Sequence, residues 1–252
     1  MTHTTSRGRR NQGEITLARA ISKFGIASRT QAAAMVREGR VAVDGSIVRS
    51  PDRWVNPLSN EIQVDGKRIR RASPVYLAMH KPIGVVTTRS DEKGRKTIYH
   101  LLPPERQWMF PIGRLDKETS GLLLLTNDSR FGEMVTNPLG EIPKTYSVTV
   151  DRPLRDVDRR ALESRLTLAD GTRLLPAEVT PSIDNPLVFE MTIVEGKNRQ
   201  IRRMCEHLGY VVISLQRIRI GLISLGRLNV GEVRPLSREE RSGILSSFAS
   251  GE

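Results

Sequence analysis

The run Leu122–Leu125 is the feature that most constrains how this chain can fold. It is the longest uninterrupted aliphatic stretch in the sequence, and it lies between Gly121 and Thr126. A membrane-spanning helix needs about 20 apolar residues, so the run is far too short to cross a bilayer. It is also too uniformly apolar for a strand with one face in water, where apolar and polar residues alternate. The run therefore predicts a strand buried inside a core.

A polar loop precedes this predicted strand and contains the first candidate catalytic residue. Gly113 opens the loop, and Asp116 lies in it between Arg114 and Lys117. Positive charge on both sides favours the ionised carboxylate, which can act as a nucleophile or as a base. Taken alone, however, the pattern favours an Asp that merely caps a turn.

A second candidate segment runs from Val188 to Leu208, where a predicted strand leads into a predicted helix over 199–208. One face of this helix is apolar, and arginines occupy the rest. Arg199 and Arg202 lie near its start, where the helix dipole favours anions. Something acidic should compensate, and the candidates are RNA phosphate and the ionised Asp116. The alternative is a surface helix whose arginines pair with nearby Glu residues.

Tyr146 lies in the predicted strand Lys144–Val150 and is one of four tyrosines. An aromatic side chain beside an acidic site could stack on a nucleobase. The alternative is an ordinary aromatic residue on the face of a sheet.

Residues 73–245 as a whole predict an α+β domain with a mainly antiparallel sheet. Many strands with few crossover helices argue against a doubly wound parallel sheet. The predicted strands are 75–79, 84–88, 121–126, 144–150, 173–175, 177–180, 188–194 and 211–217. The predicted helices are 129–136, 154–164, 199–208 and one that opens with a capping box at 237–240. Residues 246–252 are predicted to be a frayed tail.

The front of the chain predicts a smaller module. Residues 1–13 are predicted to be a flexible basic tail, and residues 14–72 a separate domain. A helical pattern ends at Gly25, and Ser28 with Gln31 forms a capping box that opens a second helix. Two Asp-Gly pairs, at 44–45 and 65–66, then predict tight hairpins. The result is a helix-turn-helix followed by β-hairpins.

Charge favours a polyanionic partner. The chain carries a formal net charge of +12, and residues 1–73 contain 14 Lys and Arg against six Asp and Glu. Such a balance promotes phosphate contacts through counterion release. Arg29, Arg37 and Arg40 lie at the ends of the second predicted helix, where they could grip phosphates. The alternative is an ordinary solvated face.

Other chemistries lack their sequence signals. The single cysteine, Cys205, excludes an intramolecular disulfide and suits a reducing cytoplasm, where we expect the protein to be located. There is no phosphate-binding or dinucleotide-binding glycine loop, no zinc-ligand cluster and no serine-hydrolase elbow. We therefore expect no cofactor, no metal, no membrane association and a monomer.

The candidate segments together resemble a known family. GRLDKETSGLLLLTND, KTYSVTV and EGKNRQIRRMCEHLGYVVISLQRIRIG resemble, in order and spacing, the signature segments of the RsuA-type bacterial ribosomal RNA pseudouridine synthases. YLAMHKPIGVVTTRSDEKGRKTIYHLLP is similar to the family's opening strand and loop. Residues 15–70 are similar to the small alpha-L RNA-binding domain that the family carries at its N-terminus. One departure is His80, where the family pattern leads us to expect Asn.

The resemblance implies a role for each candidate residue. Asp116 would be the catalytic aspartate, Tyr146 would pack against the target base, and Arg202 would pair with Asp116. Substrate binding would fall to Arg114, Lys197 and Arg199, with Leu215 as an apolar wall of the pocket. The substrate would be a uridine of ribosomal RNA, free or in a pre-ribosomal particle, with a leaning towards the large subunit.

Two rival interpretations remain at this point. One is a non-catalytic assembly factor that binds ribosomal RNA on the same fold. The other is a different RNA enzyme, such as a nuclease or a methyltransferase, whose metal-binding or cofactor-binding motifs the sequence lacks. The mechanism also stays open, because Asp116 could attack the ribose or the base, or remove the ribose 2′ proton.

Overall fold

The computed structural model describes residues 13–70, 73–103 and 109–249. The chain divides into two compact units, Met1–Pro74 and Val75–Glu252. Residues 1–12 of the predicted basic tail lie outside the described residues. Helices combined with mainly antiparallel strands confirm the predicted α+β class.

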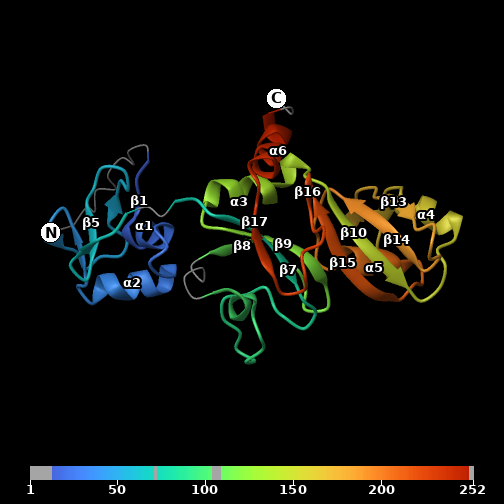
Figure 1. Ribbon diagram of the computed structural model, residues 1–252, viewed down its shortest axis with the longest axis horizontal. Helices are drawn as coiled ribbons and strands as arrows, with labels where there is room; N and C mark the ends of the chain where they lie inside the picture. The colour runs from blue at the N-terminus through green and yellow to red at the C-terminus, as the bar shows by residue number, and fades with distance from the viewer. Residues whose placement is uncertain (1–12, 71–72, 104–108, 250–252) are drawn as a thin grey trace, which may run out of the picture. The chain divides into compact units, whose positions relative to one another are not determined.

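The N-terminal unit contains the predicted helix-turn-helix and hairpins (Figure 1). The capping box is present, because the Ser28 side chain accepts a hydrogen bond from Gln31 N and the Gln31 side chain accepts one from Ser28 N. Buried residues of both helices pack against the strands in one apolar core. The elements are β1 (Ile15–Thr16), α1 (Leu17–Lys23), α2 (Arg29–Arg37), β2 (Val41–Val43), β3 (Ser46–Ile47), β4 (Trp54–Val55), β5 (Ile62–Val64) and β6 (Lys67–Arg68).

The two predicted Asp-Gly turns join β2 to β3 and β5 to β6. Asp44 and Gly45 have φ values of 50° and 79°, and Asp65 and Gly66 have φ values of 50° and 73°. A type I′ turn needs positive φ at both central residues, which Asp tolerates and Gly adopts freely. The hairpin prediction is therefore confirmed at both positions.

The second unit is built on a nine-stranded sheet with the order β13-β14-β10-β15-β9-β7-β17, to which β16 and β8 add at β15 and β9. Every pairing is antiparallel except that of β9 with β15. The strands of this sheet are β7 (Tyr76–Lys81), β8 (Phe110–Ile112), β9 (Ser120–Thr126), β10 (Lys144–Val150), β13 (Glu178–Pro181), β14 (Val188–Ile193), β15 (Val212–Ile220), β16 (Ile223–Ser224) and β17 (Val233–Pro235).

Helices and turns surround this sheet. The helices are α3 (Ser129–Thr136), α4 (Asp156–Leu162), α5 (Gln200–His207) and α6 (Arg238–Ala249), and the 3-10 turns are η1 (Ile98–Leu101) and η3 (Pro138–Gly140). A small hairpin of β11 (Leu166–Thr167) and β12 (Arg173–Leu174) completes the unit. Helix α6 includes residues 246–249 of the segment predicted to be a frayed tail.

Both faces of β9 are covered, which explains its uniform apolar sequence. Leu122 and Leu124 belong to a core cluster with residues of α3 and α6, whereas Leu123 and Leu125 belong to a cluster with residues of the 85–115 segment. All four leucines are 0% exposed. The buried strand predicted from Leu122–Leu125 is therefore confirmed, and it lies between β15 and β7 in the sheet.

Gly121 allows the one parallel pairing in this sheet. Its φ is +102°, and a Cβ at this position would lie 2.2 Å from the carbonyl oxygen of Arg217 on β15. Any side chain at position 121 would therefore push β9 away from β15. This close approach brings the loop before β9 beside the strand that follows α5.

The strand predictions for this unit need correction in two ways. Residues 84–88 form no strand, and only Val86 makes an isolated bridge, to Thr97. Apolar residues suggested a strand, but Val85 instead packs into the core cluster beneath Leu123 and Leu125. Strands β8, β11, β16 and β17 of this unit were missed because each is only two or three residues long. No described helix is both long enough and apolar enough to cross a membrane.

Candidate active site

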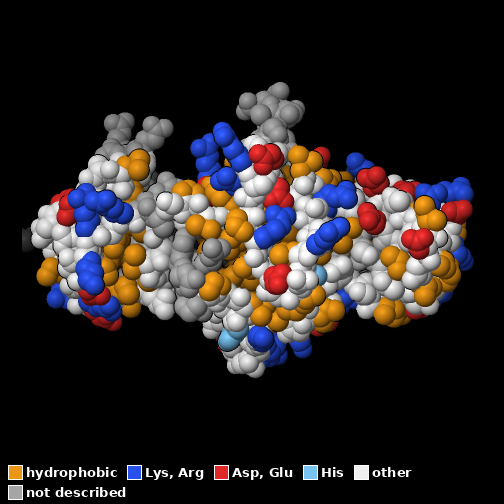
Figure 2. Space-filling model, in the orientation of Figure 1, with side chains coloured by type: hydrophobic (Ala, Val, Ile, Leu, Met, Phe, Trp, Pro, Cys, Tyr) orange, Lys and Arg blue, Asp and Glu red, His pale blue; other side chains and the backbone are white. Residues whose placement is uncertain are grey.

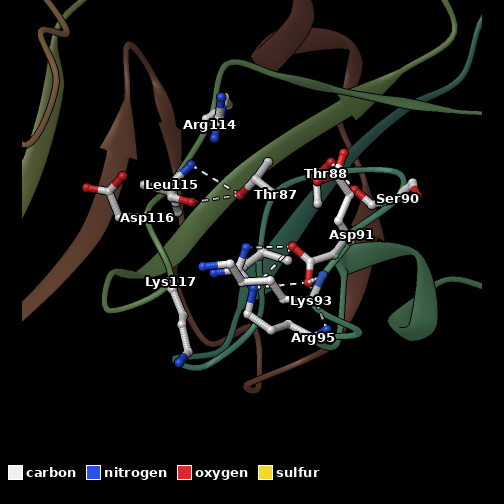
Figure 3. A pocket seen from close by; sticks show the side chains of 12 residues that line it. Thr87, Thr88, Ser90, Asp91, Lys93, Arg95, Arg114, Leu115, Asp116 and Lys117 are labelled. Atoms are coloured by element: carbon white, nitrogen blue, oxygen red, sulfur yellow. Dashed lines mark hydrogen bonds and ion pairs between the residues drawn. The ribbon is translucent and has the colours of Figure 1, made fainter.

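Asp116 lies in the loop that joins β8 to β9, as the sequence predicts. Its side chain is half-buried, while Arg114 and Lys117 are exposed. In Figure 3 the side chains of Arg114, Asp116 and Lys117 leave the loop in three different directions. Asp116 is therefore not enclosed between the two cations that flank it in the sequence.

The backbone of this loop is held at successive residues from other parts of the unit. Thr87 Oγ1 donates to the carbonyl oxygen of Leu115 at 2.8 Å and accepts from its N–H at 3.3 Å. The N–H of Gly84 donates to the carbonyl oxygen of Lys117 at 2.8 Å. A turn closes the loop, because Thr119 N donates to Asp116 O at 3.1 Å. These bonds fix where the Asp116 side chain leaves the backbone.

Lys81 adds a further anchor, which the sequence analysis missed. It is the last residue of β7 and is 0% exposed, and its ammonium donates to the carbonyl oxygens of Thr119 at 2.8 Å and Pro82 at 3.0 Å. Burial lowers the pKa of Lys81 to about 8, although the charges of Asp116 and Glu118 act in the opposite direction. The signal in the sequence is a lysine that ends an otherwise apolar strand just before Pro82.

Arg202 reaches the loop from α5, but not through the predicted ion pair with Asp116. Its Nη2 donates to the carbonyl oxygen of Glu118 at 2.9 Å, and its Nη1 donates to that of Val212 at 3.0 Å. The planar guanidinium spans two backbone acceptors, which a fork of donors does well. Desolvation lowers the pKa of Arg202, and the charges of Glu118 and Asp116 oppose that shift. Arg202 therefore bridges the Asp116 loop and β15.

The acidic partner expected near the start of α5 is Glu118. Its Oε2 lies 3.4 Å from Nη1 of Arg199, which immediately precedes the helix. This finding agrees with the simpler alternative, in which the arginines pair with a nearby Glu. It leaves Asp116 without an ion pair within 4.0 Å in the part of the chain that the structure describes.

Tyr146 lies on β10, directly opposite Arg217 of β15 and Met191 of β14. It is half-buried and packs against two core clusters, one that contains Leu115 and one that contains Leu215. Leu215 is 5% exposed, so it is a core residue beside Tyr146. The roles of Tyr146 in base packing and of Leu215 as a pocket wall stay predictions.

Arg217 is a second buried cation that the sequence analysis did not single out. It is 5% exposed, and its Nε donates to the carbonyl oxygen of Leu122 at 2.7 Å. Its Nη2 is buried and has no hydrogen-bond partner among the described residues. A buried donor without a partner is costly, so this atom marks a place where an anion or a carbonyl would be stabilised.

A cavity of about 400 Å³ opens beside Asp116. Its lining comes from the Asp116 loop and from residues 86–95, and it includes Arg114 and Lys117 (Figure 3). Asp91 shapes the far wall, because its carboxylate accepts hydrogen bonds from the guanidinium and backbone of Arg95. Those bonds lower the pKa of Asp91 to about 2. The wall is therefore polar and carries both signs of charge.

Lys197, a predicted substrate-binding residue, and His80, which departs from the family pattern, are both bonded to groups of their own unit. The Lys197 ammonium pairs with Glu195 at 2.9 Å and donates to the carbonyl oxygen of Arg173. His80 is buried, with Nδ1 2.8 Å from Leu228 O and Nε2 3.1 Å from Gln216 Nε2. Because a carbonyl can only accept, Nδ1 of His80 carries the proton and Nε2 accepts from Gln216. Lys197 as a substrate-binding residue stays a prediction.

The basic residues of the N-terminal unit differ in how they are engaged. Arg40 makes two hydrogen bonds to Asp65, at 2.8 and 2.7 Å. Arg29 and Arg37 are exposed at the two ends of α2. On the face shown in Figure 2, basic side chains of this unit lie in separate patches with acidic ones beside them. Arg29 and Arg37 are therefore more available to a phosphate than Arg40.

The remaining reactive groups lie in the core. Burial raises the pKa of the Cys205 thiol to about 12, in keeping with a core residue. Among the described residues, no three His, Cys, Asp or Glu side chains are grouped to hold a metal ion.

Fold and site together define a class: a helix-turn-helix module with β-hairpins, followed by an α+β unit whose half-buried aspartate lies in a hydrogen-bonded loop beside a polar cavity. The sequence matches the RNA pseudouridylate synthase family over residues 75–207 and the S4 domain over residues 16–57. The chain therefore belongs to the RNA pseudouridylate synthase family and is an enzyme.

Individual relatives agree with this assignment. The chain is 38% identical to ribosomal large subunit pseudouridine synthase B of Bacillus subtilis (strain 168), over 89% of this chain and 93% of that protein. It is 36% identical to the dual-specificity RNA pseudouridine synthase RluF of Salmonella typhi, over 87% of this chain and 75% of that protein. A solved pseudouridylate synthase shares 29% identity with a TM-score of 0.67, covering 91% of this chain and 99% of the other. These relatives and the S4 domain confirm the resemblance to the RsuA type.

Proposed function

We propose that this enzyme isomerises a uridine of ribosomal RNA, in the large subunit, to pseudouridine, with Asp116 as the catalytic residue. The family match over residues 75–207 supports the reaction. The name of the Bacillus subtilis relative supports the substrate. The observation that carries the assignment of Asp116 is the loop itself, whose backbone is held at Leu115, Lys117, Glu118 and Thr119 while the Asp116 carboxylate stays free of an ion pair among the described residues.

The reaction breaks the bond between the ribose C1′ and N1 of the base and forms one between C1′ and C5. C5 loses a proton and N1 gains one, so atoms balance without an oxidant or a transferred group. A carboxylate can stabilise or trap positive charge that develops on the sugar, as in glycoside hydrolysis. Attack on the ribose, attack on the base and removal of the 2′ proton all remain compatible with this position of Asp116.

The surrounding residues would divide the supporting work. Lys81 and Arg202 would hold the Asp116 loop through its carbonyl oxygens and so position the carboxylate. The uridine must leave its stack to reach the site, at a cost of a few kcal/mol, and Tyr146 would recover part of that by stacking. Arg29 and Arg37 of the S4 domain would contact phosphates and position the RNA without reading its sequence.

The substrate can be tested in cells. Pseudouridines in ribosomal RNA are mapped by carbodiimide-blocked primer extension in a strain with the gene and in one without it. We expect a primer-extension stop in large-subunit ribosomal RNA that is lost when the gene is deleted. The stop should return when a wild-type copy is supplied, and should not return when an Asp116→Asn copy is supplied. Unchanged stops in both ribosomal subunits would contradict the proposed substrate.

A further inference from the structure

Glu118 lies among three positive side chains at the edge of the Asp116 loop. Its carboxylate is 3.4 Å from the guanidinium of Arg199, and its carbonyl oxygen accepts from Arg202 at 2.9 Å. Lys117 is its neighbour in the chain. The largest cause of a lowered pKa at Glu118 is its own backbone N–H, and the charges of Arg199, Lys117 and Arg202 act in the same direction. Glu118 is therefore an anion held where positive charge converges.

Arg199 is placed there by an unusual backbone conformation. Its φ and ψ are 47° and 33°, in the left-handed region that residues other than glycine rarely adopt. Such conformations are costly and persist where the surroundings impose them, often at ligand sites. The carbonyl oxygen of Arg199 accepts from Arg203 N at 3.0 Å, so the strained residue also forms the first turn of α5. From this position its guanidinium lies 3.4 Å from the Glu118 carboxylate.

The contact between Arg199 and Glu118 is easily exchanged. The two side chains are 46% and 56% exposed, and 3.4 Å is long for a charged hydrogen bond. An exposed ion pair of this kind contributes little to stability. A phosphodiester carries the same single negative charge and offers two oxygens to the planar guanidinium fork, which matches phosphate well. An RNA phosphate can therefore replace the Glu118 carboxylate without a large rearrangement.

The position suits a phosphate next to the target nucleotide. Glu118 follows Asp116 by two residues, so their α-carbons are at most about 7 Å apart. That separation is comparable to the one between a ribose and its own phosphates. An anion that replaced the Glu118 carboxylate would thus be held at the same short loop, two residues along the chain from Asp116.

We propose that Arg199, with Lys117 nearby, forms a subsite for the RNA phosphate adjacent to the target uridine, and that Glu118 occupies this subsite until RNA displaces it. The proposal rests on the proposed function in that it takes RNA as the substrate. It adds a binding subsite and an internal competitor that opposes RNA binding. Glu118 would then weaken the binding of RNA that is not correctly placed for reaction. Only an RNA whose phosphate reaches the Arg199 guanidinium replaces the carboxylate.

The test measures RNA binding by Glu118→Gln. The probe is a fluorescein-labelled RNA hairpin with a uridine-containing loop, and its Kd is measured by anisotropy at low salt. We expect Glu118→Gln to bind about three- to fivefold more tightly than the wild type, the range that loss of an exposed ion pair accounts for. The matched control is Glu178→Gln, which removes the same charge from an exposed position on β13. It should change Kd much less.

A second binding measurement tests the role of Arg199. In the double variant Glu118→Gln, Arg199→Gln, the gain in affinity should disappear, because the phosphate has lost its partner. The proposal is overturned if Glu118→Gln binds no more tightly than Glu178→Gln, or if the gain persists without Arg199. Weaker binding by Glu118→Gln would instead show that Glu118 only orients Arg199, which also overturns it. Thermal melts of each variant verify that it is folded.

These outcomes are independent of the catalytic assignment. Binding is measured without turnover, so failure of Asp116 as the catalytic residue leaves the Kd comparison intact. Conversely, a variant series with unchanged Kd values would remove the Glu118 proposal and leave uridine isomerisation untouched.

Discussion

The ammonium of Lys81 donates a 2.8 Å hydrogen bond to the carbonyl oxygen of Thr119 and so ties the end of β7 to the loop that carries Asp116. Lys81 is fully buried, and the hydrogen bonds of its ammonium go to the carbonyl oxygens of Pro82 and Thr119. Its charge is therefore stabilised by two carbonyl oxygens and by the more distant carboxylates of Asp116 and Glu118. The Asp116 loop is held by a buried cation that bonds to backbone carbonyl oxygens.

This arrangement predicts a pH dependence of stability. The pKa of Lys81 falls from 10.5 to about 8 on folding, so between these values the unfolded chain binds more protons than the folded one. Stability should therefore rise with pH, by about 2 kcal/mol between about pH 7.5 and about pH 10 if Lys81 acts alone. Urea unfolding at about pH 7.5 and about pH 10 measures it.

Lys81→Met is the control for that experiment, because it removes the titrating group and keeps the apolar stem. Subtracting the unfolding free energy of the variant from that of the wild type cancels the contributions of the other groups that titrate in the same range. If the difference in unfolding free energy between the wild type and Lys81→Met is the same at both pH values, the lowered pKa of Lys81 is contradicted.

Arg202→Lys should slow turnover while leaving RNA binding nearly unchanged. A lysine keeps the charge but cannot span the carbonyl oxygens of Glu118 and Val212 together. The loop would shift, and a small displacement of a catalytic group costs about 100-fold in rate. We expect that loss in kcat with little change in KM. An equal loss in binding would instead place Arg202 in substrate recognition.

Gly121→Ala should unfold the second unit or destabilise it by at least about 2 kcal/mol. The added Cβ would meet the Arg217 carbonyl oxygen at 2.2 Å, and neither strand can yield without breaking the parallel pair. Gly171→Ala is the matched control, since Gly171 also has a positive φ, +80°, but no atom within 4 Å. Equal unfolding midpoints for the two variants would show that the close approach of β9 and β15 is not required.

Much of this architecture is predictable from the sequence because it depends on local patterns. The capping box at Ser28 and Gln31, the two Asp-Gly turns and the buried strand Leu122–Leu125 each follow from a short run of residues. The strand predicted over 84–88 fails because its apolar residues pack as a covering segment. Apolar side chains alone do not distinguish those two arrangements.

The contacts of the site are less predictable because they depend on pairing between distant strands. Arg202 meets the Glu118 carbonyl only because β15 runs parallel to β9 at Gly121. A sequence pattern cannot show that a guanidinium prefers two backbone oxygens to the carboxylate of Asp116. The buried positions of Lys81 and Arg217 are likewise set by the sheet, and neither residue resembles a core residue in sequence.

Substitutions of the N-terminal arginines should differ in how they change the salt dependence of RNA binding. Arg29→Ala and Arg37→Ala should each make the slope of log Kd against log salt shallower by about one unit, the effect of losing one phosphate contact. Arg40→Ala should change the slope little, because Arg40 is already bonded to Asp65. Filter binding of an RNA hairpin across a salt series measures all three. A larger slope change for Arg40 than for Arg29 would contradict this division.

The most direct measurement is tritium release from C5 of uridine-labelled ribosomal RNA by Asp116→Asn. The variant keeps the size of the side chain and removes the carboxylate. We expect release to fall to the level without enzyme, while the Kd for the same RNA stays close to that of the wild type. Release at a rate near the wild-type value would show that another group performs the reaction.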